Sequence, residues 1–121
     1  MRVVRGGAAG LLLLLACSSR LPHPVYSAHT TAELVPVPYP PPPPRVEEIP
    51  PRPSGDALWI DGEWGWRRKK WTWRPGRWAA PAPGTTYSPW TVTRDEAGTL
   101  YFAPGTWRDA SGQPVAHGTP P

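Results

Sequence analysis

The chain has very little cysteine: Cys17 is the only one among 121 residues, so no disulfide can form within it. The apolar run at residues 11–15 is too short to cross a bilayer as a helix. The sequence also has no phosphate-binding loop, nucleophile motif or cofactor fingerprint. These absences exclude a fold held by internal disulfides, and they predict that the protein is not an enzyme and has no catalytic residues. Stability must therefore come from burial of side chains or from partners.

The N-terminus has the layout of an export signal. Arg2 and Arg5 precede the apolar run, and small Ala16 stands before Cys17. Residues 14–17, Leu-Leu-Ala-Cys, resemble the lipobox of bacterial lipoproteins. The resemblance implies that a lipoprotein signal peptidase removes residues 1–16 by cutting between Ala16 and Cys17. Cys17 would then carry a diacylglycerol on its thiol and an acyl chain such as palmitate on its amine, with no other cofactor.

This anchor sets the predicted location. We expect a lipid-anchored protein of the cell envelope, on its periplasmic or surface face. Ser18 follows the lipidated cysteine, and the resemblance to Gram-negative lipoproteins implies that a residue other than aspartate at this position permits export to the outer membrane. The alternative is an ordinary secretory signal in which the cysteine lies near the cleavage point by chance.

The charge of the chain is close to balanced once the signal is removed. Subtracting Arg2 and Arg5 from 13 basic residues leaves 11 against 9 acidic ones. Six basic residues cluster in the tryptophan-rich part of the chain and alternate there with tryptophans: Arg67, Arg68, Lys69, Lys70, Arg74 and Arg77. Such interleaving suits single-stranded nucleic acid in a cytosolic protein. For an exported lipoprotein we predict no nucleic-acid partner, and contact with anionic envelope material instead.

Residues 17–54 are predicted to be the lipidated N-terminus and a disordered, proline-rich tether. Residues 36–53 contain ten prolines, and residues 40–44 are an unbroken proline run. Proline blocks helices and central strands and favours the extended polyproline conformation, so the segment would act as a stiff spacer. The alternative is a proline-rich recognition motif for an aromatic groove.

Residues 55–116 are predicted to be the folded unit, followed by a disordered tail at residues 117–121. All eight tryptophans lie between Trp59 and Trp107. Aromatic residues recur with a period of fourteen, and a turn candidate follows each by eight positions, at residues 67–70, 81–84, 95–98 and 109–112. The aromatic positions of this period are Trp59, Trp73, Tyr87 and Tyr101.

Each predicted strand is broken near its middle by glycine or proline, which favours a bulge or bend there. The breaks are Gly62, Pro75-Gly76, Pro89 and Pro104-Gly105. The turns place Trp64 opposite Trp73, Trp66 opposite Trp71, Val92 opposite Tyr101, Gly62 opposite Pro75, and Gly76 opposite Pro89. We therefore predict an all-β fold: a small antiparallel meander of about five kinked strands, the last a short one after Gly112.

The segments at residues 59–64 and 73–78 resemble two copies of the WxxGxW, or YXWGXW, repeat of bacterial exported proteins and lipoproteins. Residues 102–107 match with phenylalanine in first place. Residues 87–92 depart from the pattern, because they lack both the glycine and the final tryptophan. The resemblance implies an envelope location and a repeat architecture, and it brings no established chemistry.

Most tryptophans are expected to form the core, because the unit contains few other large apolar residues. We therefore predict a non-catalytic structural or adaptor module that contacts an envelope protein. The alternative is a glycan-binding or peptidoglycan-binding module, since sugars stack on indole faces. The candidate platforms, all near the predicted bends, are Trp59, Trp78, Trp90 and Trp107.

The titratable residues do not form a recognisable catalytic or metal site. His23, His29 and His117 fall in the predicted tether or tail, so we predict no bound metal. Asp61 and Glu63 flank Gly62 on a strand and could in principle hydrolyse a glycosidic bond as a pair. Strand solubility explains these two carboxylates more simply.

Overall fold

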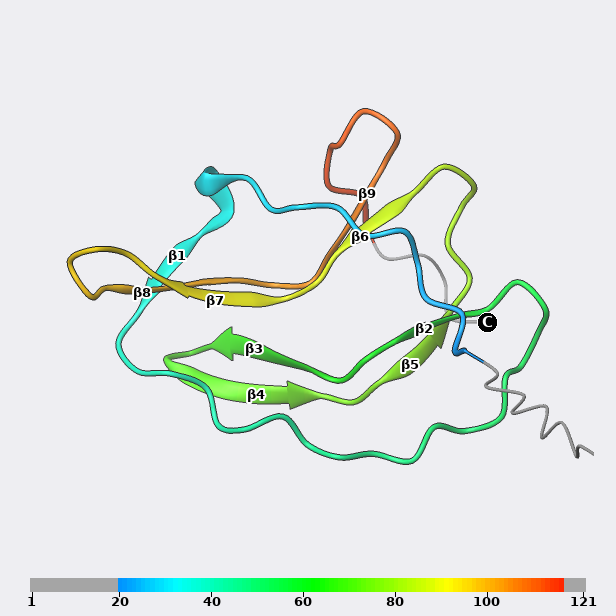
Figure 1. Cartoon of the computed structure of the whole chain (residues 1–121), viewed down its shortest axis with the longest axis horizontal. Coiled ribbons are helices and arrows are strands. Elements are labelled where there is room, and N and C mark those ends of the chain that lie inside the picture. The colour runs from blue at the N-terminus through cyan, green and yellow to red at the C-terminus, as the bar shows by residue number, and fades with distance from the viewer. Residues whose placement is uncertain (1–19, 117–121) are drawn as a thin grey trace, which may run out of the picture.

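The computed structural model describes residues 20–116, and within that range it is built almost wholly of short antiparallel strands (Figure 1). The predicted all-β class is confirmed. Among these residues, no helix has the length and apolarity needed to cross a membrane. The elements are η1 (Thr31–Glu33), β1 (Val35–Val37), β2 (Leu58–Ile60), β3 (Glu63–Arg67), β4 (Lys70–Arg74), β5 (Arg77–Ala79), β6 (Thr86–Ser88), β7 (Thr91–Arg94), β8 (Leu100–Ala103) and β9 (Thr106–Arg108).

The strands from β2 onward form four kinked strands, each interrupted where the sequence predicted a break. Gly62 separates β2 from β3, Pro75 and Gly76 separate β4 from β5, Pro89 precedes β7, and Pro104-Gly105 separates β8 from β9. In the first hairpin Trp64 pairs with Trp73 and Trp66 with Trp71, as predicted. The pairings on both sides of the break keep one register, so Gly62 also lies opposite Pro75.

The strands do not continue as a single meander, and this part of the prediction is corrected. Strands β2 to β5 form one hairpin, β6 to β9 form a second, and the two lie one over the other (Figure 1). The expected pairing of Gly76 with Pro89 is not formed in residues 20–116, because β5 pairs with β2 and β6 with β9. Pro81 and Pro83 in the connection have no N–H to extend a ladder. The predicted last strand is reduced to an isolated bridge between Arg108 and Pro114.

The later turns are closed by left-handed glycines, with φ of +79° at Gly84, +87° at Gly98 and +82° at Gly112. The extra residue at Gly98 shifts the second hairpin by one position. Val92 therefore pairs with Phe102, and not with Tyr101 as predicted. The repeated Arg-Asp-x-x-Gly frame is built the same way twice: the arginine donates to the glycine carbonyl, at 2.6 Å for Arg94 and 3.2 Å for Arg108.

The packing gives the tryptophan repeat a physical explanation. The glycine of one copy lies under the first aromatic ring of the copy on the neighbouring strand. A methyl group at Gly62 would overlap the ring of Trp73, and one at Gly76 would overlap Trp59. The facing aromatics then meet edge-on, with ring centroids 5.1 Å apart for Trp64 and Trp73. The repeat therefore encodes a pair of strands that lock through reciprocal ring-over-glycine contacts.

The second hairpin uses the same contact once and departs from it once. Tyr87 lies over Gly105 and packs against Trp107 with 4.9 Å between ring centroids. The equivalent glycine position in the third copy is Trp90, which leaves no space for a ring above it. Phe102, the ring that would lie there, instead packs edge-on against Trp71 of the first hairpin at 5.1 Å.

The segment before the repeats is ordered against them, so the prediction of a disordered tether is corrected for residues 20–54; residues 17–19 lie outside the described range. Strand β1 pairs with the edge of β8. Upstream of β1, the carbonyls of Pro22 and Val25 accept hydrogen bonds from the N–H groups of Trp59 and Tyr87. The physical reason is that the hairpins have open edges whose backbone groups need partners. The predicted tail at residues 117–121 also lies outside the described range.

Candidate functional site

A proline strap, defined as residues 38–53, lies against Trp71, Trp73 and Trp78, which together form the tryptophan face of β4 and β5. It runs beside these strands between β1 and β2 (Figure 1). Three indole N–H groups donate to it: Trp71 to the Tyr39 carbonyl at 3.1 Å, Trp73 to the Glu47 carboxylate at 2.8 Å, and Trp78 to the Pro50 carbonyl at 2.8 Å. The strap is therefore docked on a row of indole donors.

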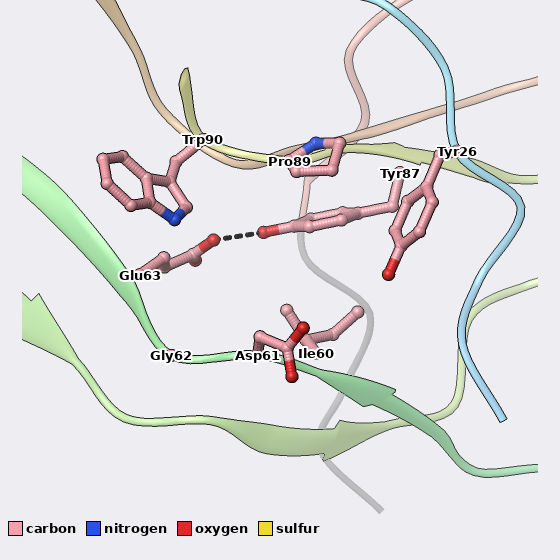
Figure 2. Close-up of a pocket in the computed structure, with 8 residues that line it drawn as sticks. All are labelled: Tyr26, Ile60, Asp61, Gly62, Glu63, Tyr87, Pro89 and Trp90. Carbon is pink, nitrogen blue, oxygen red and sulfur yellow. Dashed lines mark hydrogen bonds between the residues drawn. The ribbon is translucent and has the colours of Figure 1, made fainter. Parts of the chain in front are cut away.

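A hollow of about 110 Å³ lies between the two hairpins, beside Gly62 (Figure 2). Glu63 and Tyr87 both line it, and the Tyr87 hydroxyl donates a hydrogen bond to Glu63 with an O–O distance of 2.5 Å. Figure 2 shows the ring of Trp90 on one side of this bond, Tyr26 on the other, and Asp61 across from both. A second hollow of about 390 Å³, lined in part by Asp61, Gly62, Trp90 and the strap, adjoins the first.

Glu63 is the electrostatic centre of the hollow. It is buried, and besides the Tyr87 hydroxyl it contacts the guanidinium groups of Arg77 at 3.2 Å and Arg74 at 3.7 Å. Burial, with the nearby negative charge of Glu63, raises the pKa of Tyr87 far above its ordinary value. Tyr87 therefore stays a hydrogen-bond donor throughout the physiological pH range, and Glu63 acts as an acceptor that holds the two hairpins together.

The structure separates the four candidate platforms. Trp59 and Trp107 are buried, at 3% and 5% exposure, so they belong to the core and their assignment as platforms is corrected. Trp78 is half-buried and donates to the strap. Trp90 is also half-buried, and it lines both hollows. Of the four, Trp90 is the ring best placed to meet a ligand.

The carboxylates considered for catalysis act as acceptors for aromatic donors. Asp61 accepts the indole N–H of Trp59 at 2.9 Å, and Glu63 accepts the Tyr87 hydroxyl. The histidines of the predicted tether also contact backbone carbonyls: His23 lies 3.2 Å from the carbonyl oxygen of Trp59, and His29 lies 2.6 Å from that of Pro89. No group of three or more metal-ligating side chains occurs in residues 20–116. Ala16, Cys17 and His117 lie outside that range.

The basic cluster of the first hairpin is divided by the structure. Arg74 and Arg77 face Glu63, whereas Arg68 and Lys69 form the exposed turn, with φ of +49° and +63°. The tryptophans between them pack on one another or on the strap, with Trp66 and Tyr39 meeting edge-on at 5.3 Å. The described residues therefore do not present a continuous surface of alternating cations and free rings.

An ionic cluster around buried Arg108, with half-buried Glu33, was not predicted from the sequence. Arg108 is 3% exposed, donates to both oxygens of Glu33 at 2.6 Å, and donates to the buried Ser88 hydroxyl at 2.7 Å. This hydrogen bonding from Arg108 lowers the pKa of Glu33 from 4.5 to about 2. The cluster fastens η1 to β9. The only signal in the sequence is the repeated Arg-Asp-x-x-Gly frame, which locates the arginine and gives no hint of its partner.

Comparison of the chain with protein-family models, with curated proteins and with solved structures gives no match. The resemblance to the tryptophan repeat of bacterial lipoproteins therefore stays a prediction.

Proposed function

We propose that the chain is a non-catalytic adaptor lipoprotein of the cell envelope, anchored through lipid on Cys17. The observation that carries the proposal is the use of the aromatic residues: each of the eight tryptophans is buried or half-buried, and most pack on rings of a neighbouring strand. This use supports a rigid body built for display and contact. The carboxylates near the hollow serve as acceptors within that body, which also favours a structural role.

The ordered segment 20–54 changes how the anchor would work. If Cys17 carries the lipid, only Ser18 and Ser19 separate it from Arg20, after which the chain packs against the hairpins. Three residues extend at most about 10 Å. We propose that the folded body lies at the membrane surface, and not several nanometres away on a spacer.

The anchor is tested by replacing Cys17 with serine and labelling cells with an alkyne analogue of palmitate. We expect the variant to lose all label and to leave the membrane fraction, because serine has no thiol to receive the diacylglycerol. A Ser19→Ala variant is the control and should keep both properties. Label that persists in Cys17→Ser would contradict the lipobox.

A second function, glycan binding, is favoured by one observation. Trp90 occupies the place that glycine takes in the other three copies, and it lines both hollows together with the exposed carboxylate of Asp61. A departure from an otherwise consistent pattern, in a concave place, is typical of a binding site. An indole face beside a free carboxylate oxygen suits a saccharide, which can stack on the ring while its hydroxyl groups donate to the acid.

Co-sedimentation with purified peptidoglycan tests this second function. We expect saturable retention that falls at least tenfold in Trp90→Ala, since the platform is lost. Glu96→Ala, in an exposed turn away from the hollows, should bind like the unaltered chain. If Trp90→Ala is retained as well as Glu96→Ala, or if none of the three proteins is retained, Trp90 is not a glycan platform.

A further inference from the structure

We infer that the tryptophan face of β4 and β5 is a binding surface for extended, proline-rich peptides, and that the proline strap is its internal occupant. The partner would be a proline-rich segment of another polypeptide that takes the place of the strap. This inference rests on the proposed adaptor function, because it names the chemistry of the partner that an adaptor would contact.

The docking contacts are those that proline-rich recognition uses. Trp71 and Trp78 donate their indole N–H groups to the backbone carbonyls of Tyr39 and Pro50. A polyproline segment has no internal hydrogen bonds and keeps its carbonyls available, and its stiffness reduces the entropy lost on docking. Since these acceptors are backbone atoms, any extended segment of similar composition can supply them.

One side chain of the strap adds selectivity. The two carboxylate oxygens of Glu47 accept from the Trp73 indole and from the backbone N–H of Gly76, each at 2.8 Å. These two donors lower the pKa of Glu47. Gly76 is the repeat glycine, and its N–H is free to bind a side chain because the strand is broken at Pro75. The preferred ligand therefore carries an acidic residue after its proline run.

The strap is held by its bonds to the indoles and Gly76 and by Tyr39, which packs on Trp66 and donates its hydroxyl to the Lys69 carbonyl at 3.3 Å, whereas most of its other residues are exposed and can be displaced. Its residues from Pro42 to Pro53 are exposed, and Val46 is fully so. Besides the indole contacts, Arg45 lies over the ring of Trp64, with 5.4 Å from the guanidinium carbon to the ring centroid. The strap is joined to β1 and β2 at its ends, so its local concentration is on the order of millimolar. A separate peptide must therefore reach a comparable concentration to displace the strap, unless a mutation weakens the contacts of the strap.

The test uses a fluorescent synthetic peptide of residues 38–53 and the full chain in detergent, with binding measured by anisotropy. In Glu47→Ala the internal strap loses both carboxylate contacts while the peptide still brings its own glutamate. We expect this variant to bind the peptide at least tenfold more tightly than the unaltered chain. The same peptide carrying Glu47→Ala should bind the variant at least tenfold more weakly than the original peptide.

A second variant guards against misfolding of the first. Pro42→Gly with Pro43→Gly makes the strap flexible without removing an indole contact, and it should also bind the peptide more tightly than the unaltered chain. Failure of both variants to bind, equal binding by all three proteins, or indifference to the glutamate of the peptide would each overturn the inference. Because the assay uses no membrane, such a failure leaves the fatty-acid labelling result, and so the anchor, standing.

Discussion

A Gly62→Ala variant is expected to lose about 3 kcal/mol of unfolding free energy, because the added methyl group has no space beneath the ring of Trp73. The ring cannot simply move aside. Its indole N–H is held by Glu47, and it packs edge-on against Trp64, which is 4% exposed. Either the first hairpin opens at its break or the ring leaves its position, and both outcomes lose buried aromatic contact. Urea denaturation followed by tryptophan emission measures the change.

Gly65→Ala, three residues after Gly62 and within β3, provides the matched control. A methyl group there would meet only the Thr72 carbonyl oxygen, at an ordinary 3.7 Å. Since glycine within a strand is less stable than alanine by about 0.5–1 kcal/mol, this variant should be unchanged or slightly more stable. If both variants unfold at the same urea concentration, the ring-over-glycine explanation of the repeat is wrong.

The first hairpin could be predicted in detail because its information is local. Glycine and proline mark the breaks, and the two-residue turn at Arg68 and Lys69 fixes the pairing of Trp64 with Trp73. The predicted register of the second hairpin was wrong by one residue. A turn closed by a left-handed glycine can hold one residue more or fewer, and the sequence pattern around Gly98 does not distinguish the two.

The strap could not be predicted from its own composition. A proline-rich segment has too few apolar side chains to fold alone, so local reasoning indicates disorder. What orders it is a row of indole donors that comes later in the chain and needs acceptors. The interpretation of the prolines as a recognition motif for an aromatic groove stays a prediction. Composition alone could not show that the segment docks on its own chain, since the indole donors of β4 and β5 form a row only once these strands are kinked and paired.

The candidate site was predicted in part. The tryptophans near the breaks could be named, but burial depends on which hairpin lies above each ring, and so Trp59 and Trp107 could not be separated from Trp90. Arg108 was missed for a related reason. An arginine at a strand end is usually exposed. Arg108 is buried because the segment that contains η1 packs against β9, and sequence patterns do not reveal this long-range contact.

An Arg108→Leu variant is expected to be less stable by about 3 kcal/mol, since the change removes a buried guanidinium that is hydrogen-bonded to half-buried Glu33 and to buried Ser88. Glu33 would lose the Nη2 donor that its two oxygens share, and the buried Ser88 hydroxyl would lose the Nε donor at 2.7 Å. Because these bonds join η1 to β9, limited proteolysis should cut residues 20–54 faster than in the unaltered chain. Arg94→Leu is the control: Arg94 makes the same contact with its turn glycine, at an exposed position. Equal loss of stability in the two variants would contradict the role of the cluster.

The same cluster predicts how stability depends on pH. Folding lowers the pKa of Glu33 from 4.5 to about 2, so its contribution is fully present above pH 4.5 and is lost as the pH falls through about 2. A Glu33→Gln variant keeps the shape of the side chain and removes the charge. Its Tm should lie below that of the unaltered chain at pH 6, and the gap should narrow steadily towards pH 2. Other carboxylates also make stability depend on acid, such as Asp109, whose pKa is lowered by hydrogen bonds from Ser111 and Gln113 in its turn. Both proteins share this dependence, so it cancels in the difference between their Tm values. A gap that stays constant from pH 6 to pH 2 would show that the charge of Glu33 does not hold η1 in place.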